Sequence, residues 1–345
     1  MLTQAACSLA RFAFLSLALL SLGCQKESES VVSIALHPKN PDILYVATND
    51  AVYKSRDGGG TWEKFPSFSA RRVTTLAIDP LLPATIYAGT MGDAVYKSPD
   101  GGQHWLPHNV GLKEHVSFIN QFVFHPAASE QIYAATTVGA FYTKDAGREW
   151  IERMNGMKEV HIVTSIAINP KEPAVLYGGT TGGVYRSDDA AATWKKINTG
   201  LIPETELMAA MALGVNAIEI DRTKPDVVYA GTTKGLFRTV DKGEHWERIG
   251  QSVTDPYISS VVLHPTDSSL LYLGGPAGVW KSSDSGKTWQ AMNQGLTTLN
   301  IRALAMAPSN PQMLYAGTNG SGLYRSNDAG ATWMSVPLKA AAAQR

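Results

Sequence analysis

The sequence has little cysteine, no excess of either charge and only one long hydrophobic run. Its two cysteines, Cys7 and Cys24, both lie in the first 24 residues. The rest of the chain therefore has no disulfide, and its stability must come from packing, which a chain of 345 residues can supply. The formal net charge is zero, and no run of like charges stands out. This argues against a nucleic-acid partner, which would select an excess of basic residues on one face.

The hydrophobic run, Phe12 to Leu22, follows an arginine that is the only ionised side chain of residues 1–24. Eleven residues would rise about 16 Å as a helix, too little to span a bilayer. This arrangement is typical of a signal peptide. The segment ends in Leu-Ser-Leu-Gly-Cys24, which resembles a bacterial lipobox with Ser where Leu is usual. We expect an exported, periplasmic or cell-surface lipoprotein that is anchored to the membrane through Cys24; an ordinary signal peptide cut near Gly23 is the alternative.

An eight-residue segment, first seen as Ser55-Arg-Asp-Gly-Gly-Gly-Thr-Trp62, occurs seven times along the chain. Successive copies end at tryptophans that are 43, 45, 44, 52, 43 and 44 residues apart. A period near 44 is the size of one four-stranded propeller blade. The sequence therefore predicts an all-β fold, a single seven-bladed β-propeller over residues 31–338. The seven segments contain Asp57, Asp100, Asp145, Asp189, Asp241, Asp284 and Asp328, and Trp62, Trp105, Trp150, Trp194, Trp246, Trp289 and Trp333.

Each repeat carries four short strand signals that are separated by turn residues. The second strand has a tyrosine in register in every repeat, from Tyr45 to Tyr315. Such a column can look like a ligand stripe, but aromatic rings also fill the gaps between blades well, and we expect the latter. We place the blades at about 31–68, 73–112, 119–157, 163–201, 215–253, 258–296 and 301–338, with a tether over 25–30 and a disordered tail over 339–345.

The pattern Ser/Thr-x-Asp-x-Gly-x-Thr-Trp resembles the Asp-box, or BNR repeat, of sialidases, sortilins, xyloglucanases and photosystem II assembly factors. The resemblance covers residues 31–338 and implies a fold, not an activity. In the first box Asp57 can accept hydrogen bonds from its own turn, Gly59 supplies a positive φ, and Trp62 packs the turn on the blade. We therefore expect the boxes to be structural; metal binding by some of them is the alternative. Ala191 replaces the glycine of the fourth box, so that turn should be strained or differently shaped.

The resemblance places binding sites on the face of the connectors between blades, at one mouth of the central channel. The inner strands carry a polar column there, which either orients a ligand or forms a solvated rim. Arg71, Arg72 and Tyr257 are further candidates on this face. The column consists of Thr74, Asn120, Thr164, Asn216, Ser259 and Arg302, with Val32 in the first blade.

Two irregularities fall in the fourth and fifth blades. Glu219 interrupts a column of small or apolar residues on the inner strands, where a carboxylate must reach water or a cation. The connector over 201–213 is roughly eight residues longer than the others and contains good helix formers. We expect both to lie in one sector of the connector face and to carry the function. A carboxylate that faces channel water and an ordinary rim helix are the alternatives. The candidates in the connector are Glu204, Glu206, Met208 and Met211.

Catalytic signals are few. No two histidines have the spacing of metal ligands on one element, and no phosphate-binding loop or Gly-x-Ser-x-Gly motif is present. We predict no metal, no cofactor and no assigned catalytic residue. Sialidases need three arginines and a Tyr–Glu pair, and xyloglucanases place their carboxylates between two propellers, whereas this chain has one. Glu219 could still approach Asp255 or Glu204 and form a carboxylate pair.

The sequence therefore favours an exported, lipid-anchored propeller that acts as a binding or assembly scaffold for a protein or glycan partner. Length, leader and blade count resemble those of the photosystem II assembly factors, although the characteristic arginine patch of those proteins is not evident. We expect a monomer that does not bind nucleic acid. A glycoside hydrolase, similar to sialidases or xyloglucanases and with its active site at the channel mouth, is the alternative function.

Overall fold

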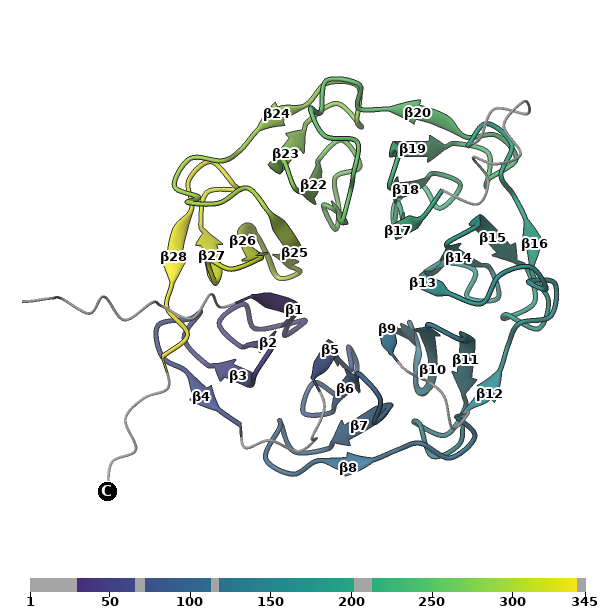
Figure 1. Cartoon of the computed structure of the whole chain (residues 1–345), viewed down its shortest axis with the longest axis horizontal. Helices are drawn as coiled ribbons and strands as arrows, with labels where there is room; N and C mark the ends of the chain where they lie inside the picture. The colour runs from purple at the N-terminus through teal and green to yellow at the C-terminus, as the bar shows by residue number, and fades with distance from the viewer. Residues whose placement is uncertain (1–29, 66–71, 113–117, 202–212, 340–345) are drawn as a thin grey trace, which may run out of the picture.

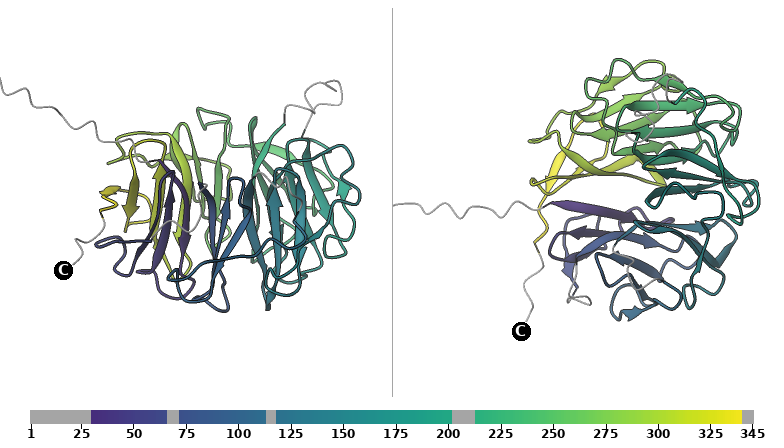
Figure 2. Two further views of the ribbon diagram at one scale, coloured as in Figure 1. Left: turned by 60° about the horizontal axis from the view of Figure 1, so that its bottom comes forward. Right: turned by 45° about the vertical axis from the view of Figure 1, so that its right-hand side comes forward.

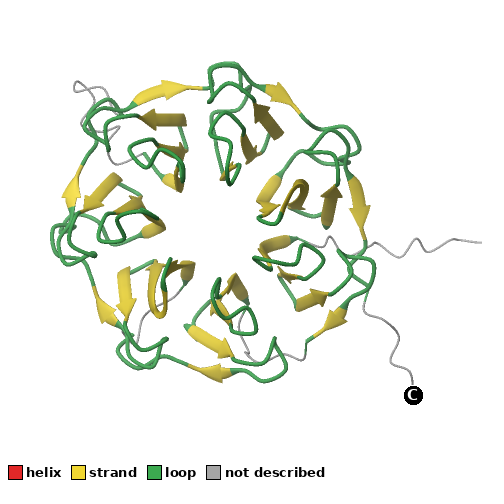
Figure 3. Cartoon of the chain, turned by 180° about the vertical axis from the view of Figure 1, so that it is seen from behind, coloured by secondary structure: helices red, strands yellow, loops and turns green. Residues whose placement is uncertain are grey.

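Seven four-stranded antiparallel sheets stand in a ring around a central axis (Figure 1). The computed structural model describes residues 30–65, 72–112, 118–201 and 213–339. Each sheet consists of four strands that are consecutive in the chain, and the described residues form no helix (Figure 3). The predicted single seven-bladed β-propeller is confirmed. Within the described residues no helix is long and apolar enough to cross a membrane.

The strands fall into four classes by their distance from the axis. The innermost strands are β1 (Val31–Leu36), β5 (Val73–Ile78), β9 (Ile119–His125), β13 (Val163–Ile168), β17 (Val215–Ile220), β21 (Ser260–Leu263) and β25 (Ile301–Ala307). The second strands are β2 (Leu44–Thr48), β6 (Ile86–Thr90), β10 (Ala128–Thr136), β14 (Leu176–Thr180), β18 (Val228–Thr232), β22 (Leu271–Gly275) and β26 (Asn310–Thr318).

The third strands are β3 (Val52–Ser55), β7 (Val95–Ser98), β11 (Gly139–Thr143), β15 (Gly183–Ser187), β19 (Gly235–Thr239), β23 (Gly278–Ser282) and β27 (Leu323–Ser326). The outermost strands are β4 (Glu63–Lys64), β8 (Leu106–Pro107), β12 (Ile151–Glu152), β16 (Lys195–Lys196), β20 (Glu247–Ile249), β24 (Gln290–Ala291) and β28 (Met334–Val336). The outermost strands are short and largely exposed, which leaves little free sheet edge for another chain to pair with.

The tyrosine column of the second strands lies between blades, as predicted. All seven rings are buried, and the hydroxyl group usually donates to a backbone carbonyl in the box of the following blade. Tyr45 donates to the Gly101 oxygen at 3.0 Å, and Tyr87 donates to the Ala146 oxygen at 3.0 Å. Each tyrosine therefore buries its ring and satisfies its polar end in the same blade-to-blade interface.

The boxes form tight turns between the third and outermost strands. Asp57 accepts hydrogen bonds from the Thr61 backbone N–H and hydroxyl group, at 2.8 and 2.7 Å, and the Ser55 hydroxyl accepts from the Gly59 N–H at 2.7 Å. These bonds lower the pKa of Asp57 to about 2 because they favour the ionised carboxylate. Four of the box tryptophans donate to the preceding blade, as the Trp246 indole N–H does to the Ile197 carbonyl at 2.8 Å, whereas Trp105 and Trp289 donate to a glycine carbonyl of their own box.

The fourth box shows the predicted departure in shape. Ala191 has a φ of 65°, whereas the glycines at the same position of the other boxes have φ values from 86° to 99°. A Cβ atom makes the larger positive angles costly, so the alanine stays in the left-handed helical region. The Ala191 N–H still donates to the Ser187 hydroxyl at 2.9 Å, so the turn keeps its hydrogen bonds.

The ring closes without exchange of a strand between the first and last blades. β1–β4 form the first sheet and β25–β28 the last, and the two sheets lie side by side (Figures 1 and 2). Tyr315 and Arg325 both donate to the Gly58 carbonyl, at 3.0 and 2.8 Å. On the opposite face the Ser30 hydroxyl donates to Asn319 Oδ1 at 2.9 Å. Side-chain hydrogen bonds and packing, rather than a shared sheet, close the ring.

Candidate functional site

The inner strands form two mouths, one at each end of the channel. Every inner strand after β1 begins next to the connector from the preceding blade, and every inner strand ends at the turn that leads to its second strand. This turn contacts the box of the same blade: the Gly58 N–H donates to the Asp42 carbonyl, and the Gly101 N–H to the Ala84 carbonyl, both at 2.8 Å. We call the mouth at the strand starts the connector mouth and the mouth at the strand ends the box-side mouth.

The connector mouth contains a cavity of about 510 Å³ with polar walls. Its lining comes from the third to the seventh blades, and a connector residue, Tyr257, joins the inner strands. Besides Tyr257 the lining includes Asn120, Thr164, Asn216, Ser259, Pro276, Asn300, Ile301, Arg302 and Asn319.

The polar column at this mouth holds neighbouring blades together. Asn120 Nδ2 donates to the Val163 carbonyl of the next inner strand at 2.7 Å, and Asn216 Nδ2 donates to the Ile258 carbonyl at 2.8 Å. Thr74, Thr164 and Ser259 make the equivalent bonds to Ile119, Val215 and Ile301. The sequence suggested a ligand-orienting ring or a solvated rim, and the structure adds a role that neither interpretation contained. These donors are already used within the fold.

Arg302 and Tyr257 differ from the rest of this mouth. Arg302 is the member of the column in the seventh blade, it is exposed, and no described residue forms a hydrogen bond or an ion pair with its guanidinium group. Tyr257 is 43% exposed, and its backbone N–H is fixed by Asp255 Oδ1 at 2.8 Å. The structure thus brings into one cavity an accessible aromatic ring and a cation that has no partner among the described residues.

The other candidates of the connector face are not part of this cavity. Arg72 is exposed just before β5, and its carbonyl accepts from the Met91 N–H at 2.8 Å. Residues of the long connector, the neighbouring arginine and the cysteine of the leader lie outside the described residues. These are Arg71, Glu204, Glu206, Met208, Met211 and Cys24, together with the helix predicted near 204–213 and the tail beyond residue 339.

Glu219 lies at the other mouth, which corrects the expectation that it shares the connector face with the 201–213 insertion. β17 begins at Val215, next to the insertion, and Glu219 is near its far end, paired with Tyr229. The expectation failed because the position of a residue along a strand decides which face it lies near, and Glu219 is the fifth of the six residues of β17. Glu219 instead lines a box-side cavity of about 490 Å³ and a smaller one of about 190 Å³ beside it.

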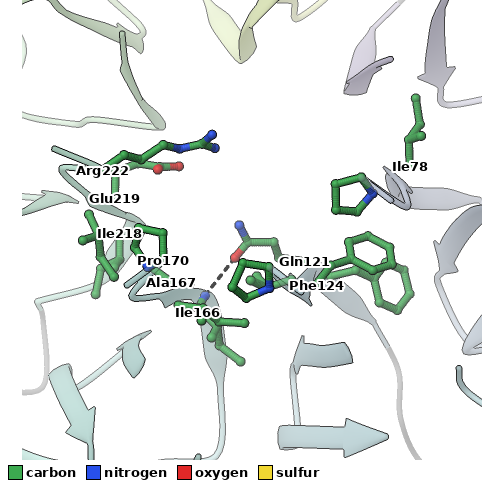
Figure 4. A pocket seen from close by; sticks show the side chains of 15 residues that line it. Ile78, Gln121, Phe124, Ile166, Ala167, Pro170, Ile218, Glu219 and Arg222 are labelled. Carbon is green, nitrogen blue, oxygen red and sulfur yellow. Dashed lines mark hydrogen bonds between the residues drawn. The ribbon is translucent and has the colours of Figure 1, made fainter. Parts of the chain in front are cut away.

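The lining of the two box-side cavities is apolar apart from three side chains. Figure 4 shows Glu219 and Arg222 extending side by side into the cavity from the end of β17, and Gln121 reaching toward the same space from β9. Gln121 Oε1 accepts from the Ile166 N–H at 2.8 Å, which fixes the amide with its Nε2 atom turned to the cavity. The apolar walls of both cavities include Ile78, Phe122, Phe124, Ile166, Ile218, Ile220, Val261, Leu263, Leu304 and Met306.

Arg222 is a residue that the sequence reasoning missed. It follows the inner strand at a position where the other six blades have a proline, and Glu219 replaces alanine or valine in the same repeat. An alignment of the seven repeats could have identified Arg222, because this position is a proline in six repeats and a charged residue in one. The prolines are Pro38, Pro80, Pro126, Pro170, Pro265 and Pro308.

The environment of Glu219 favours its neutral form. Burial at the mouth raises the pKa of its carboxyl group from the ordinary value of 4.5 to about 7, and the nearby charge of Arg222 opposes this only in part. No described residue donates a hydrogen bond to the carboxylate, and Arg222 is not within the 4.0 Å of an ion pair. A carboxyl group with this pKa can give or take a proton near neutral pH.

Comparison with known proteins gives the same architecture. The Sortilin-Vps10 family model, described as sortilin, neurotensin receptor 3, matches residues 25–178. Among solved structures, the GH74 xyloglucanase from Xanthomonas campestris has a TM-score of 0.62 at 18% identity over 91% of this chain, and an ancestral GH74 enzyme has 0.72 at 18% over 89%. YCF48 bound to a D1 peptide has 0.62 at 17% over 87% of this chain. No curated protein matches the sequence.

The chain is a seven-bladed propeller whose boxes resemble the Asp-box repeat. It spans 61% and 46% of the two GH74 enzymes' lengths and 94% of the YCF48 chain. At these identities the likeness to solved structures shows the shared fold, and the function of this propeller must be argued from its own residues.

Of the two carboxylate pairs considered from the sequence, the described residues exclude the one between Glu219 and Asp255, which lie at opposite mouths. Glu219 is the only carboxylate that lines the box-side cavities, and Asp255 belongs to the connector side, where its Oδ1 atom is engaged by Tyr257. Glu204 lies outside the described residues. The described residues also contain no group of three or more His, Cys, Asp or Glu side chains that could hold a metal ion.

Proposed function

We propose that this propeller is a binding protein that holds an acidic, extended segment of a partner polypeptide at the connector mouth. The observation that carries the proposal is the guanidinium group of Arg302, which no described residue pairs, in a polar cavity of about 510 Å³. A guanidinium group binds a carboxylate through two parallel N–H bonds. Asn120 and Asn216 use their Nδ2 donors on the neighbouring blade, and each retains Oδ1 as an acceptor for a peptide N–H.

Tyr257 supports a peptide partner by supplying contact area beside Arg302. Tyrosine and arginine are among the residue types that contribute most to binding energy in protein interfaces, and both line this cavity. The solved structure of YCF48, a propeller similar to this chain, contains a D1 peptide, so a propeller of this size can bind a peptide. A hydrolase of the GH74 type is less favoured, because the described residues at neither mouth supply a pair of carboxylates.

The test compares labelled peptides that differ only in charge. Decapeptides rich in Asp and Glu are titrated with the protein and followed by fluorescence anisotropy, alongside the same peptides with Asn and Gln. We expect the acidic set to bind at least tenfold more tightly. Arg302→Ser should remove this difference, and the serine is a matched replacement because Ser259 occupies the column in the sixth blade.

Arg72→Ser is the control, since Arg72 is an exposed arginine on the connector side outside the cavity lining. Equal binding of acidic and neutral peptides would reject the acidic-peptide partner. A glycan that stacks on Tyr257 would behave differently: its binding would be lost in Tyr257→Ala and retained in Arg302→Ser.

We also propose that the propeller works outside the cytoplasm, as a monomer anchored to a membrane through a lipid on Cys24. The support is the leader-like composition of residues 1–24 and the Gly-Cys that ends it. Cys24→Ala should move the protein from the membrane fraction to the soluble fraction. Membrane association that is unchanged in Cys24→Ala would remove the lipid anchor from the proposal.

A further inference from the structure

The fifth blade differs from the other six at two positions, and folding places both at the box-side mouth. Glu219 stands in the small-residue column and Arg222 in the proline column. The two side chains extend together into one cavity (Figure 4). A propeller needs neither residue for packing, because six blades pack with small residues and prolines at these positions.

A third polar side chain accompanies the two charged ones, and one of its two polar atoms has no partner among the described residues. Gln121 is fixed through its Oε1 atom, and no described residue accepts a hydrogen bond from Nε2. The surrounding walls are aliphatic and aromatic, and the cavity of about 490 Å³ has the volume of a typical small-molecule pocket. Unpaired polar groups at one end of an apolar pocket are suited to a ligand with one polar end.

The charge balance at this mouth selects the polar end of the ligand. Arg222 carries a full positive charge that no carboxylate of the described chain pairs at ion-pair distance, and a cationic ligand would be repelled by it. Arg222, Gln121 Nε2 and the protonated form of Glu219 are all hydrogen-bond donors. An ionised carboxylate accepts at both oxygens and donates nothing, so it complements this set.

We propose that the box-side mouth binds a small apolar carboxylic acid, with its carboxylate held by Arg222, Gln121 and protonated Glu219 and its hydrocarbon body against the inner strands. Glu219 donates its proton in a hydrogen bond to the ligand carboxylate, and no covalent bond is made or broken. Ionisation of Glu219 removes this donor and places two carboxylates together, so the ligand is released as the pH rises.

Among the groups that face Glu219, none is expected to titrate in the pH range of the proposed release. From its own blade these are Arg222 and Tyr229; Tyr229 lies opposite in the β17–β18 ladder and is buried with a raised pKa. Asp221 is buried and accepts from the Thr223 and Lys224 N–H groups within its turn. The residues that line the cavities from β13 and β21 are apolar.

The experiment is calorimetric titration of the full chain with cyclohexanecarboxylate, which stays ionised from pH 6 upward. Because the Glu219 pKa is about 7, we expect affinity to fall about thirtyfold between pH 6 and pH 8.5. Binding near neutral pH should take up protons, which repeat titrations in buffers of different ionisation enthalpy measure. Acetate, which lacks the apolar body, and cyclohexylmethylamine, which has the opposite charge, should bind much more weakly.

Two variants separate the proposed roles. Glu219→Gln keeps a neutral donor, so it should bind at pH 8.5 as tightly as at pH 6. Arg222→Pro restores the residue of the other six blades and should lose binding at both pH values, and Arg302→Ser at the opposite mouth should leave binding unchanged. Affinity that is independent of pH in the unmodified chain, preference for the amine, or full binding by a folded Arg222→Pro variant would each overturn the proposal.

Discussion

The two mouths of the channel are made from the same seven strands, yet they use polar residues in opposite ways. At the connector mouth most members of the polar column donate to the next blade, as Asn120 and Asn216 do, and Arg302 has no partner among the described residues. At the box-side mouth apolar side chains surround Glu219 and Arg222, which make no hydrogen bond or ion pair within the described chain. A polar column repeated in every blade serves the fold, and a residue that breaks the repeat is left free to bind.

The largest expected effect concerns the frame that both mouths share. Trp246→Ala removes a buried indole ring and its hydrogen bond to the Ile197 carbonyl, and should cost about 3–5 kcal/mol of unfolding free energy. Denaturant unfolding measures this loss. Binding at either mouth, measured below the melting temperature, should not change. A variant of unchanged stability that lost binding at one mouth would show that the box takes part in recognition.

The next expected effect is a pH-dependent change in stability that comes from Glu219 at the box-side mouth. The folded-state pKa of Glu219, about 7, is above its ordinary value of 4.5, so the folded protein binds this proton more tightly than the unfolded chain. The resulting stability is complete below about pH 4.5 and is lost as the pH rises through 7. Glu219→Gln cannot ionise and should be about 1–2 kcal/mol more stable than the unmodified protein at pH 8.5, after allowance for partial exposure.

Melting temperatures at pH 5 and pH 8.5 measure this difference, and the two proteins should converge at the lower pH. The box aspartates act in the opposite direction. Asp57 has a pKa lowered to about 2, so its stabilising contribution is present above about pH 4 and is lost as the pH falls toward 2. The unmodified protein and Glu219→Gln should both lose this stabilisation as the pH falls toward 2. A Glu219→Gln variant that gained its stability at pH 5 instead would contradict the assignment of Glu219 as a neutral group.

A smaller effect is expected from the bonds of the connector mouth. Asn216→Ala removes the donor to the Ile258 carbonyl and leaves a partly buried acceptor unsatisfied, which should cost about 1 kcal/mol. Thermal unfolding measures it, with Asn120→Ala as the equivalent change two blades earlier. If neither variant were destabilised, the column would be a solvated rim after all.

The smallest expected effect on stability is that of Arg302, which is compared with the asparagines of the same mouth. Arg302→Ser should change the unfolding free energy by less than about 0.5 kcal/mol, because Arg302 is exposed and makes no bond within the described fold. The same thermal unfolding experiment gives the value. A loss as large as that of Asn216→Ala would mean that Arg302 supports the fold, and the proposed peptide site would lose its main argument.

The sequence by itself determined the blade number, the strand order and the location of the boxes. Seven tryptophans at a period near 44 residues predict seven four-stranded blades. A ring of blades follows because each repeat can bury its faces only against its neighbours. The repeat also identified Glu219 as a departure, and a comparison of the proline column would have identified Arg222.

Only the tertiary structure decided which of these residues meet and which polar groups are free. The sequence placed Glu219 with the 201–213 insertion because the two are close in the chain, but a strand carries its two ends to opposite faces of the ring. The donors of Asn120 and Asn216 are used by carbonyl groups 43 and 42 residues away, and no local pattern reports a partner at that distance. The repeat determines the strands and turns that all blades have in common. Whether a given polar group has a hydrogen-bond partner depends on the residue that folding places beside it.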